Sequence, residues 1–176
     1  MITSNERRQQ LLEFLKAQGQ QPVSASVIAA KFGVSRQIIV GDVALLRASG
    51  ADISATPRGY IFQDTSTSGN LLRTIACRHD EASLREELYT IVDFGGGVVD
   101  VSVEHPVYGQ ICGQLHIFSR YDADQFCAKL ESQMAPPLAS LTGGIHLHTI
   151  SCPNEEVLAR ILENLDKKGF LFQKND

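Results

Sequence analysis

The chain has 176 residues, of which 43% are hydrophobic and 20% are charged, and this composition excludes a wholly disordered or fibrous protein. No apolar run approaches the ~20 residues that a membrane span requires, and the N-terminus lacks the apolar stretch of a secretory signal, so we expect a cytoplasmic protein. The net charge of −4 is unevenly distributed: residues 1–64 carry +2, whereas residues 65–176 carry −6. This asymmetry favours an anionic polymer as a partner of the first part only.

The first 64 residues predict three helices and a hairpin. Apolar residues recur at helical spacing, Gly19 and Gly33 stand where two helices should end, and Ser35 is a typical helix cap. Two short strands flank a tight turn that carries Arg58. The expected elements are helices Arg7–Gln18, Ser26–Phe32 and Ser35–Arg47, and strands Ala51–Ala55 and Tyr60–Phe62. This order predicts a winged helix-turn-helix domain over residues 1–64.

The third helix has the features of a DNA-reading helix. Ile39, Val43 and Leu46 form one buried stripe, which leaves other residues of the helix to face a partner. Recognition helices reach base edges through their N-terminal residues, where Arg can address guanine and Gln adenine, while more distant arginines meet phosphate. The predicted DNA-binding residues are Ser35, Arg36, Gln37, Val40, Arg47 and Arg58. The alternative is a small helical bundle or a protein-docking wing. The stretch Ala25–Leu46 resembles the helix-turn-helix of repressors of the biotin-repressor type.

The segment Asp64–Asn70 contains no apolar side chain and reads as a linker. After it, strands and helices alternate, which predicts an α+β domain over residues 70–176. Asp122 and Asn154 are the expected caps of its last two helices. The expected strands are Leu71–Cys77, Val98–Val103, Gln110–Phe118, Ile145–Ser151 and Phe170–Gln173, and the expected helices are Ala82–Phe94, Asp122–Ser132 and Glu155–Lys168.

All five histidines follow the linker, and two of them suggest a metal site. His146 and His148 project to the same face of a strand because side chains alternate, so the pair can hold a divalent metal, with Leu147 facing the core. His79 and Glu87 can meet where a strand turns into a helix. The neighbouring acids Asp80, Glu81, Glu86 and Asp93 compete for that position, so the acidic partner is left open.

The blocks Cys77-Arg-His-Asp80, Val103-Glu-His-Pro-Val-Tyr-Gly109 and Gly144-Ile-His-Leu-His-Thr149 resemble the signature of the three-histidine domain. With the winged helix ahead of it, nearly the whole chain is similar to the niacin-responsive transcription repressors of the NiaR type. The resemblance implies a homodimeric repressor that binds operator DNA with nicotinic acid as co-repressor and controls genes for NAD-precursor synthesis or uptake. It also implies one divalent metal ion per chain, nickel or zinc, held by His79, Glu87, His146 and His148.

His105 and Tyr108 are the residues that we expect to contact the effector, from a loop shaped by Pro106 and Gly109. The alternative for His105 is an ordinary hydrogen-bonded loop histidine. Two further functions stay open on sequence grounds: a regulator for which the metal itself is the signal, and a metal-dependent hydrolase fused to a DNA-binding domain. No separate general base stands out, so we do not expect an enzyme. The four cysteines form no C-x-x-C pair and predict reduced, mostly buried thiols.

Overall fold

A computed structural model of the chain describes residues 2–63 and 69–172. The chain divides into two units, Met1–Ser68 and Gly69–Asp176, which we call the head and the body. Most of the predicted linker Asp64–Asn70 lies outside the described residues. Within the described ranges, no helix has the length and apolar character needed to cross a membrane.

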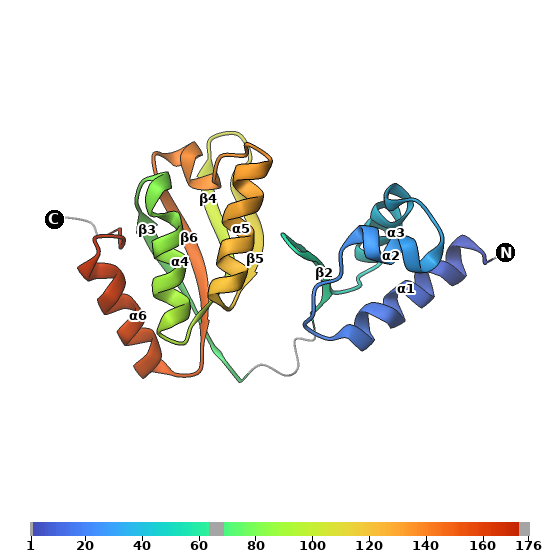
Figure 1. Ribbon diagram of the computed structural model, residues 1–176, viewed down its shortest axis with the longest axis horizontal. Helices are drawn as coiled ribbons and strands as arrows, with labels where there is room; N and C mark the ends of the chain where they lie inside the picture. The colour runs from blue at the N-terminus through green and yellow to red at the C-terminus, as the bar shows by residue number, and fades with distance from the viewer. Residues whose placement is uncertain (1, 64–68, 173–176) are drawn as a thin grey trace. The chain divides into compact units, whose positions relative to one another are not determined.

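The head contains three helices followed by a two-stranded antiparallel hairpin, which confirms the predicted winged helix-turn-helix (Figure 1). Its elements are α1 (Ser4–Gln18), α2 (Ala25–Phe32), α3 (Arg36–Ala48), β1 (Ile53–Thr56) and β2 (Gly59–Phe62). Helix α1 begins earlier than predicted because Thr3 and Glu6 form a capping box. Ser35 caps α3 as predicted, since its side chain accepts a hydrogen bond from the backbone N–H of Ile38.

Two features hold α3 and the wing in place. Asp42, buried on α3, accepts a hydrogen bond from Arg7 Nε at 2.6 Å and pairs with Arg8, so α1 is tied to α3 by charge as well as by apolar packing. At the wing, Gly59 has φ +136°, and a Cβ there would lie 2.4 Å from backbone atoms of Val23. Only glycine fits at this position, because the wing strand packs directly against the segment before α2.

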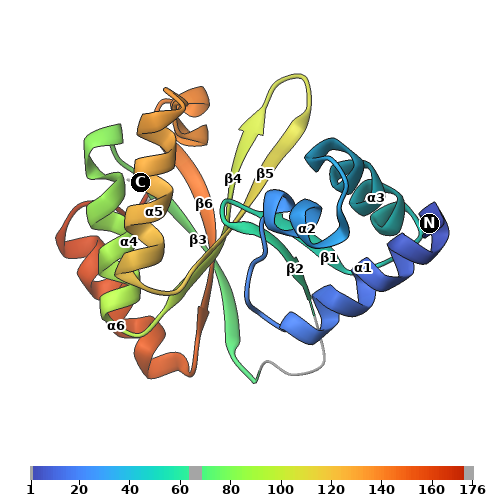
Figure 2. The ribbon, with the colours of Figure 1, turned by 45° about the vertical axis from the view of Figure 1, so that its right-hand side comes forward.

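The body is a four-stranded antiparallel sheet whose three α-helices all lie on one face (Figure 2). The strand order is β3-β6-β4-β5. The strands are β3 (Leu71–Arg78), β4 (Gly97–His105), β5 (Gly109–Ile117) and β6 (Ile145–Cys152), the helices are α4 (Leu84–Asp93), α5 (Arg120–Ser132) and α6 (Glu155–Lys167), and the 3-10 turns are η1 (Glu81–Ser83) and η2 (Leu138–Thr142). This arrangement confirms the α+β class.

Three details of the body differ from the sequence predictions. Ser119, rather than Asp122, caps α5, because its side chain accepts the Asp122 N–H while the Asp122 carboxylate accepts the N–H of Phe118. Helix α4 is preceded by the separate 3-10 turn η1. In the predicted last strand, Leu171 makes an isolated bridge to Cys77, and Gln173 lies outside the described residues. Asn154 caps α6 as expected.

Candidate metal centre and adjoining cavity

The structure brings the four predicted metal ligands together at one end of the body. His79 follows β3, Glu87 lies on α4, and His146 and His148 lie on β6, next to β3 in the sheet. The side chains of the four residues are 5%, 0%, 2% and 1% exposed, respectively. Glu87 and not Glu86 faces the histidines, since Glu86 points to solvent and pairs with Lys168 at 3.1 Å.

The three imidazoles converge on the Glu87 carboxylate through their Nε2 atoms. The distance from Nε2 to a carboxylate oxygen of Glu87 is 2.6 Å for His79, 3.0 Å for His146 and 3.4 Å for His148. The rings also pack edge to face, with centroids 4.9 Å apart between His79 and His146 and 4.8 Å apart between His146 and His148. Three nitrogens therefore lie around one carboxylate in a buried environment.

The opposite side of each ring sets its tautomer. Each Nδ1 lies 2.7–2.8 Å from a backbone carbonyl, which can only accept, so Nδ1 carries the proton. The pairs are His79 with Asp80, His146 with Gly144 and His148 with Asp100. In a neutral ring, Nε2 then presents a lone pair to the carboxylate, which is an unfavourable arrangement without a positive charge between them. Outer hydrogen bonds of this kind orient the histidine ligands of metals.

His148 supplies a direct test of whether a metal fits. Among the described residues, its Nε2 is the buried side-chain polar atom that has no hydrogen-bond partner. A buried nitrogen without a partner is costly, and it calls for an explanation such as a bound ion. A set of three imidazole nitrogens and one carboxylate suits a borderline divalent transition metal such as Zn²⁺ or Ni²⁺. The residues therefore fit the predicted metal.

Without a metal, protons provide the missing positive charge. Burial alone would raise the pKa of Glu87, but the nearby histidines, His148 first among them, hold that pKa well below its ordinary value. Burial alone would lower the pKa of His79 and His148, but the Glu87 carboxylate outweighs burial and raises both. The buried Glu87 carboxylate thus favours a positive charge beside it, whether from protonated histidines or from a metal ion.

We expect the metal-free and metal-loaded proteins to depend on pH in opposite ways. In the metal-free body, the stabilising contribution of His79 and His148 is complete below the ordinary pKa of 6.5 and is lost as pH rises through their raised values. Glu87 contributes above 4.5, and its contribution is lost as pH falls through its lowered pKa. Metal binding requires neutral imidazoles and strengthens with pH. Thermal unfolding should show a Tm difference between loaded and free protein that widens from about pH 6 to pH 9; a constant difference would contradict this.

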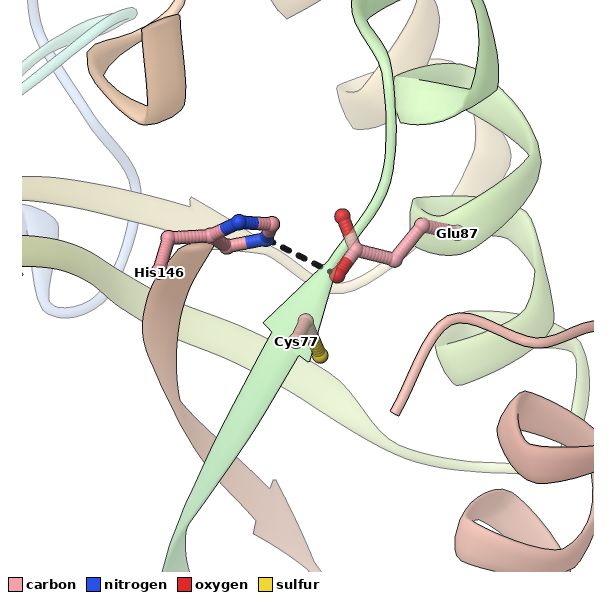
Figure 3. Close-up of side chains that lie close together, drawn as sticks. All are labelled: Cys77, Glu87 and His146. Atoms are coloured by element: carbon pink, nitrogen blue, oxygen red, sulfur yellow. Dashed lines mark hydrogen bonds and ion pairs between the residues drawn. The ribbon is translucent and has the colours of Figure 1, made fainter. Parts of the chain in front are cut away.

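Two residues near the cluster differ from what the sequence predicts. Leu147, expected in the core, is 37% exposed, because His146 and His148 take the core-facing positions on β6. Backbone carbonyls accept hydrogen bonds from both Nδ1 atoms, and His146 Nε2 also meets Glu87, which offsets much of the cost of burying the two histidines. Cys77, which was not among the predicted site residues, has its sulfur beside Glu87 and His146 (Figure 3). The available signal was alternation, since Cys77 precedes His79 by two residues, as His146 precedes His148.

A cavity of about 480 Å³ opens beside the cluster. This volume is in the range of small-molecule sites. His79, His146 and His148 line one side of the cavity, and the other walls are mostly apolar, with Arg78, Asp80 and Glu81 as the further charged lining residues. The apolar walls include Leu84, Val101, Leu115, Phe126, Pro137 and Leu138. The cavity can therefore hold a small ring and offer a polar group of that ring to the cluster.

His105 and Tyr108, the predicted effector contacts, lie away from this cavity at the β4–β5 turn. His105 Nδ1 accepts hydrogen bonds from the backbone N–H groups of Val107 and Tyr108, and its ring packs against the Tyr108 ring with centroids 5.1 Å apart. Tyr108 is 76% exposed, and neither residue lines the cavity. The geometry matches the loop-histidine alternative, and a role in effector binding stays a prediction.

In the head, four of the six predicted DNA-binding residues are exposed arginine or glutamine side chains, and their role in DNA binding stays a prediction. Arg36 and Gln37 are exposed in the first turn of α3, Arg47 is exposed in its last turn, and Arg58 is exposed at the wing turn. Val40 is half-buried and packs against the head core. A helix-turn-helix head joined to a second domain is the arrangement of a transcription regulator.

Comparisons with known proteins identify the family. A model of the HTH domain matches residues 7–61, and a model of the 3H domain matches residues 72–174. The chain is 41% identical to the probable transcription repressor NiaR of Thermotoga maritima, over 99% of this chain and 98% of that protein. It is 38% identical to the transcription repressor NadR of Bacillus subtilis, over 95% and 93% of the two chains. This chain belongs to the NiaR type of transcription repressors, which confirms the predicted family, and it is a repressor rather than an enzyme.

Proposed function

We propose that this protein is a cytoplasmic, metal-dependent repressor that binds operator DNA in response to nicotinic acid and controls genes for NAD-precursor synthesis or uptake. The observation that carries the proposal is the cavity beside the histidine cluster. Its volume of about 480 Å³ suits a single aromatic ring, and its walls are mostly apolar. A small carboxylated pyridine combines the two properties that such a site requires, an apolar ring and an anionic group.

Different groups at this cavity would contact the ring and the carboxylate of the ligand. Phe126, Leu138 and Val101 would pack against the pyridine ring, and the proposed metal ion would supply the positive charge that the carboxylate requires. His79, Glu87, His146 and His148 would hold a nickel or zinc ion. When bound, the ion supplies positive charge and open coordination positions for a carboxylate or ring nitrogen. The backbone carbonyls behind the three rings keep the histidines oriented for this task.

Response to the effector requires a change in affinity for DNA. The effector must bind the DNA-competent arrangement of the heads more tightly than the incompetent one. An effector with equal affinity for both would not change the equilibrium between them. We infer a homodimer, because one recognition helix reads only a few base pairs, whereas a two-fold pair reads an inverted repeat with half-sites one or more helical turns apart. The body, which carries the effector cavity, would supply the dimer interface.

Isothermal titration calorimetry with nicotinic acid tests the effector. We expect binding to protein loaded with Ni²⁺ or Zn²⁺, and at least ~10-fold weaker binding after the metal is removed, because the carboxylate or ring nitrogen then loses its cation. Nicotinamide, which lacks the carboxylate charge, is the matched control and should bind more weakly. Absence of nicotinic acid binding to the loaded protein would remove the effector from the proposal. Metal-dependent operator binding without any nicotinic acid effect would instead favour the metal itself as the signal.

Substitutions in the head should separate base reading from phosphate contact. We expect Arg36→Ala or Gln37→Ala to cost ~1–3 kcal/mol of operator-binding free energy and to reduce base preference, because both side chains project from the first turn of the recognition helix. Arg58→Ala, at the wing, should weaken binding to all sequences alike. Fluorescence anisotropy with operator and random duplexes measures both. Equal losses on the two duplexes for Arg36→Ala would exclude it from base readout.

A further inference from the structure

Cys77 occupies a position from which it can reach the proposed metal. It lies on β3, two residues before His79, with no exposed surface. In the β3–β6 pairing it stands directly opposite His146. Its Sγ, a carboxylate oxygen of Glu87 and a nitrogen of His146 all lie within 4.8 Å of one another (Figure 3). The thiol thus faces the same carboxylate on which the three histidines converge.

The other cysteines of the body provide a comparison. Cys127 and Cys152 are buried in the apolar core of the body, and Cys112 is exposed on β5. Cys77 also contacts that core, but within the described residues it is the cysteine that joins a group of metal-ligating side chains. A buried cysteine usually acts as a small apolar residue. Cys77 differs because two of its neighbours are a buried carboxylate and a buried imidazole.

We propose that Cys77 is a fifth ligand of the metal and selects thiophilic ions at this site. The inference rests on the proposed metal centre. Around one octahedral ion, with bonds of about 2.3 Å to sulfur and 2.0 Å to nitrogen, adjacent donors lie about 2.8–3.1 Å apart. A separation within 4.8 Å closes to this value by side-chain movements of at most about 2 Å.

Coordination replaces the S–H bond of Cys77 with a sulfur–metal bond, and the proton leaves to solvent. The donor set becomes three imidazole nitrogens, one carboxylate oxygen and one thiolate. Sulfur favours Zn²⁺, Ni²⁺ and Co²⁺ over Mn²⁺, which prefers oxygen ligands. Five protein donors also leave one position of an octahedral ion for an effector. Cys77 would therefore decide which metal the repressor uses.

Titration of Co²⁺ into the full-length, metal-free protein tests the sulfur ligand. We expect a thiolate-to-cobalt charge-transfer band in the near ultraviolet, together with the visible d–d bands of bound Co²⁺. Cys77→Ser should bind Co²⁺ without the charge-transfer band. Cys152→Ser and Cys112→Ser, which alter a buried and an exposed thiol outside the cluster, should keep the band. If Cys77→Ser does not fold, Cys77→Ala provides the same readout.

Chelator competition adds a second readout that does not depend on spectra. Cys77→Ser should weaken Zn²⁺ affinity at least ~10-fold and leave Mn²⁺ affinity within about twofold. Wild-type protein that binds Co²⁺ without a charge-transfer band would overturn the role of Cys77 and leave the metal centre intact. Wild-type protein that binds neither Co²⁺ nor Zn²⁺ would overturn the metal centre itself, and the role of Cys77 with it.

Discussion

His148→Ala should abolish metal binding and the effector response together. His148 is 1% exposed, its Nδ1 donates to the Asp100 carbonyl, and its Nε2 has no hydrogen-bond partner. The substitution removes one of the preset nitrogens and leaves Glu87 with fewer cationic neighbours. We expect metal affinity to fall at least ~100-fold, since loss of merely an outer partner of a ligand costs 10–100-fold. Elemental analysis and operator binding with and without nicotinic acid measure the two effects.

Two controls make this result specific. His116→Ala removes another buried histidine of the body, outside the cluster, and should retain metal. Weak, non-specific DNA binding by His148→Ala should survive, because the head has its own core. Stoichiometric metal in a variant with alanine at His79, His146 and His148 would place the metal site elsewhere in the chain.

Gly144→Ala should weaken metal binding although residue 144 supplies no ligand side chain. Gly144 has φ +93°, and a Cβ there would lie 2.5 Å from the carbonyl oxygen of His79. Its own carbonyl accepts the Nδ1–H of His146. A methyl group must therefore displace the backbone that positions two of the three histidines. We expect metal affinity to fall about 10–100-fold, the range for disturbed ligand orientation.

The neighbouring glycine is a matched control for this substitution. Gly143 has φ +63°, and a Cβ there would meet nothing within 4 Å. Gly143→Ala should therefore cost only the backbone strain of a left-handed alanine, about 1–2 kcal/mol of unfolding free energy, and should keep its metal affinity. Chelator competition measures the metal affinity of the two variants, and thermal unfolding measures their stability. Together they distinguish backbone strain from displacement of the histidine ligands. Equal metal affinities for both would show that contact with His79 does not position the ligand.

Local patterns in the sequence were sufficient for most elements of the fold. Helix caps such as Ser35 and Asn154, glycines at helix ends and the apolar stripe of α3 act within a few residues, so spacing alone predicts them. The errors in the elements are also local. Helices α1 and α5 begin earlier than predicted because Thr3 and Ser119, not the later residues, provide the caps.

The histidine cluster required tertiary information. Sequence spacing placed His146 and His148 on one face of a strand, but could not choose between Glu86 and Glu87, because both lie in the first turn of the same helix. Packing of α4 against the sheet decides the choice by burying Glu87 and exposing Glu86. The same packing decides that the histidines, and not Leu147, face the core.

The sequence by itself determined the class of this protein: a helix-turn-helix head, an α+β body and the histidines of a NiaR-type repressor. These follow from short-range periodicity and from motifs that the chain carries in order. Only the tertiary structure placed Cys77 beside Glu87 and separated the cavity from His105. The physical reason is that side chains distant in sequence meet through strand register and helix packing, and no local pattern encodes these contacts.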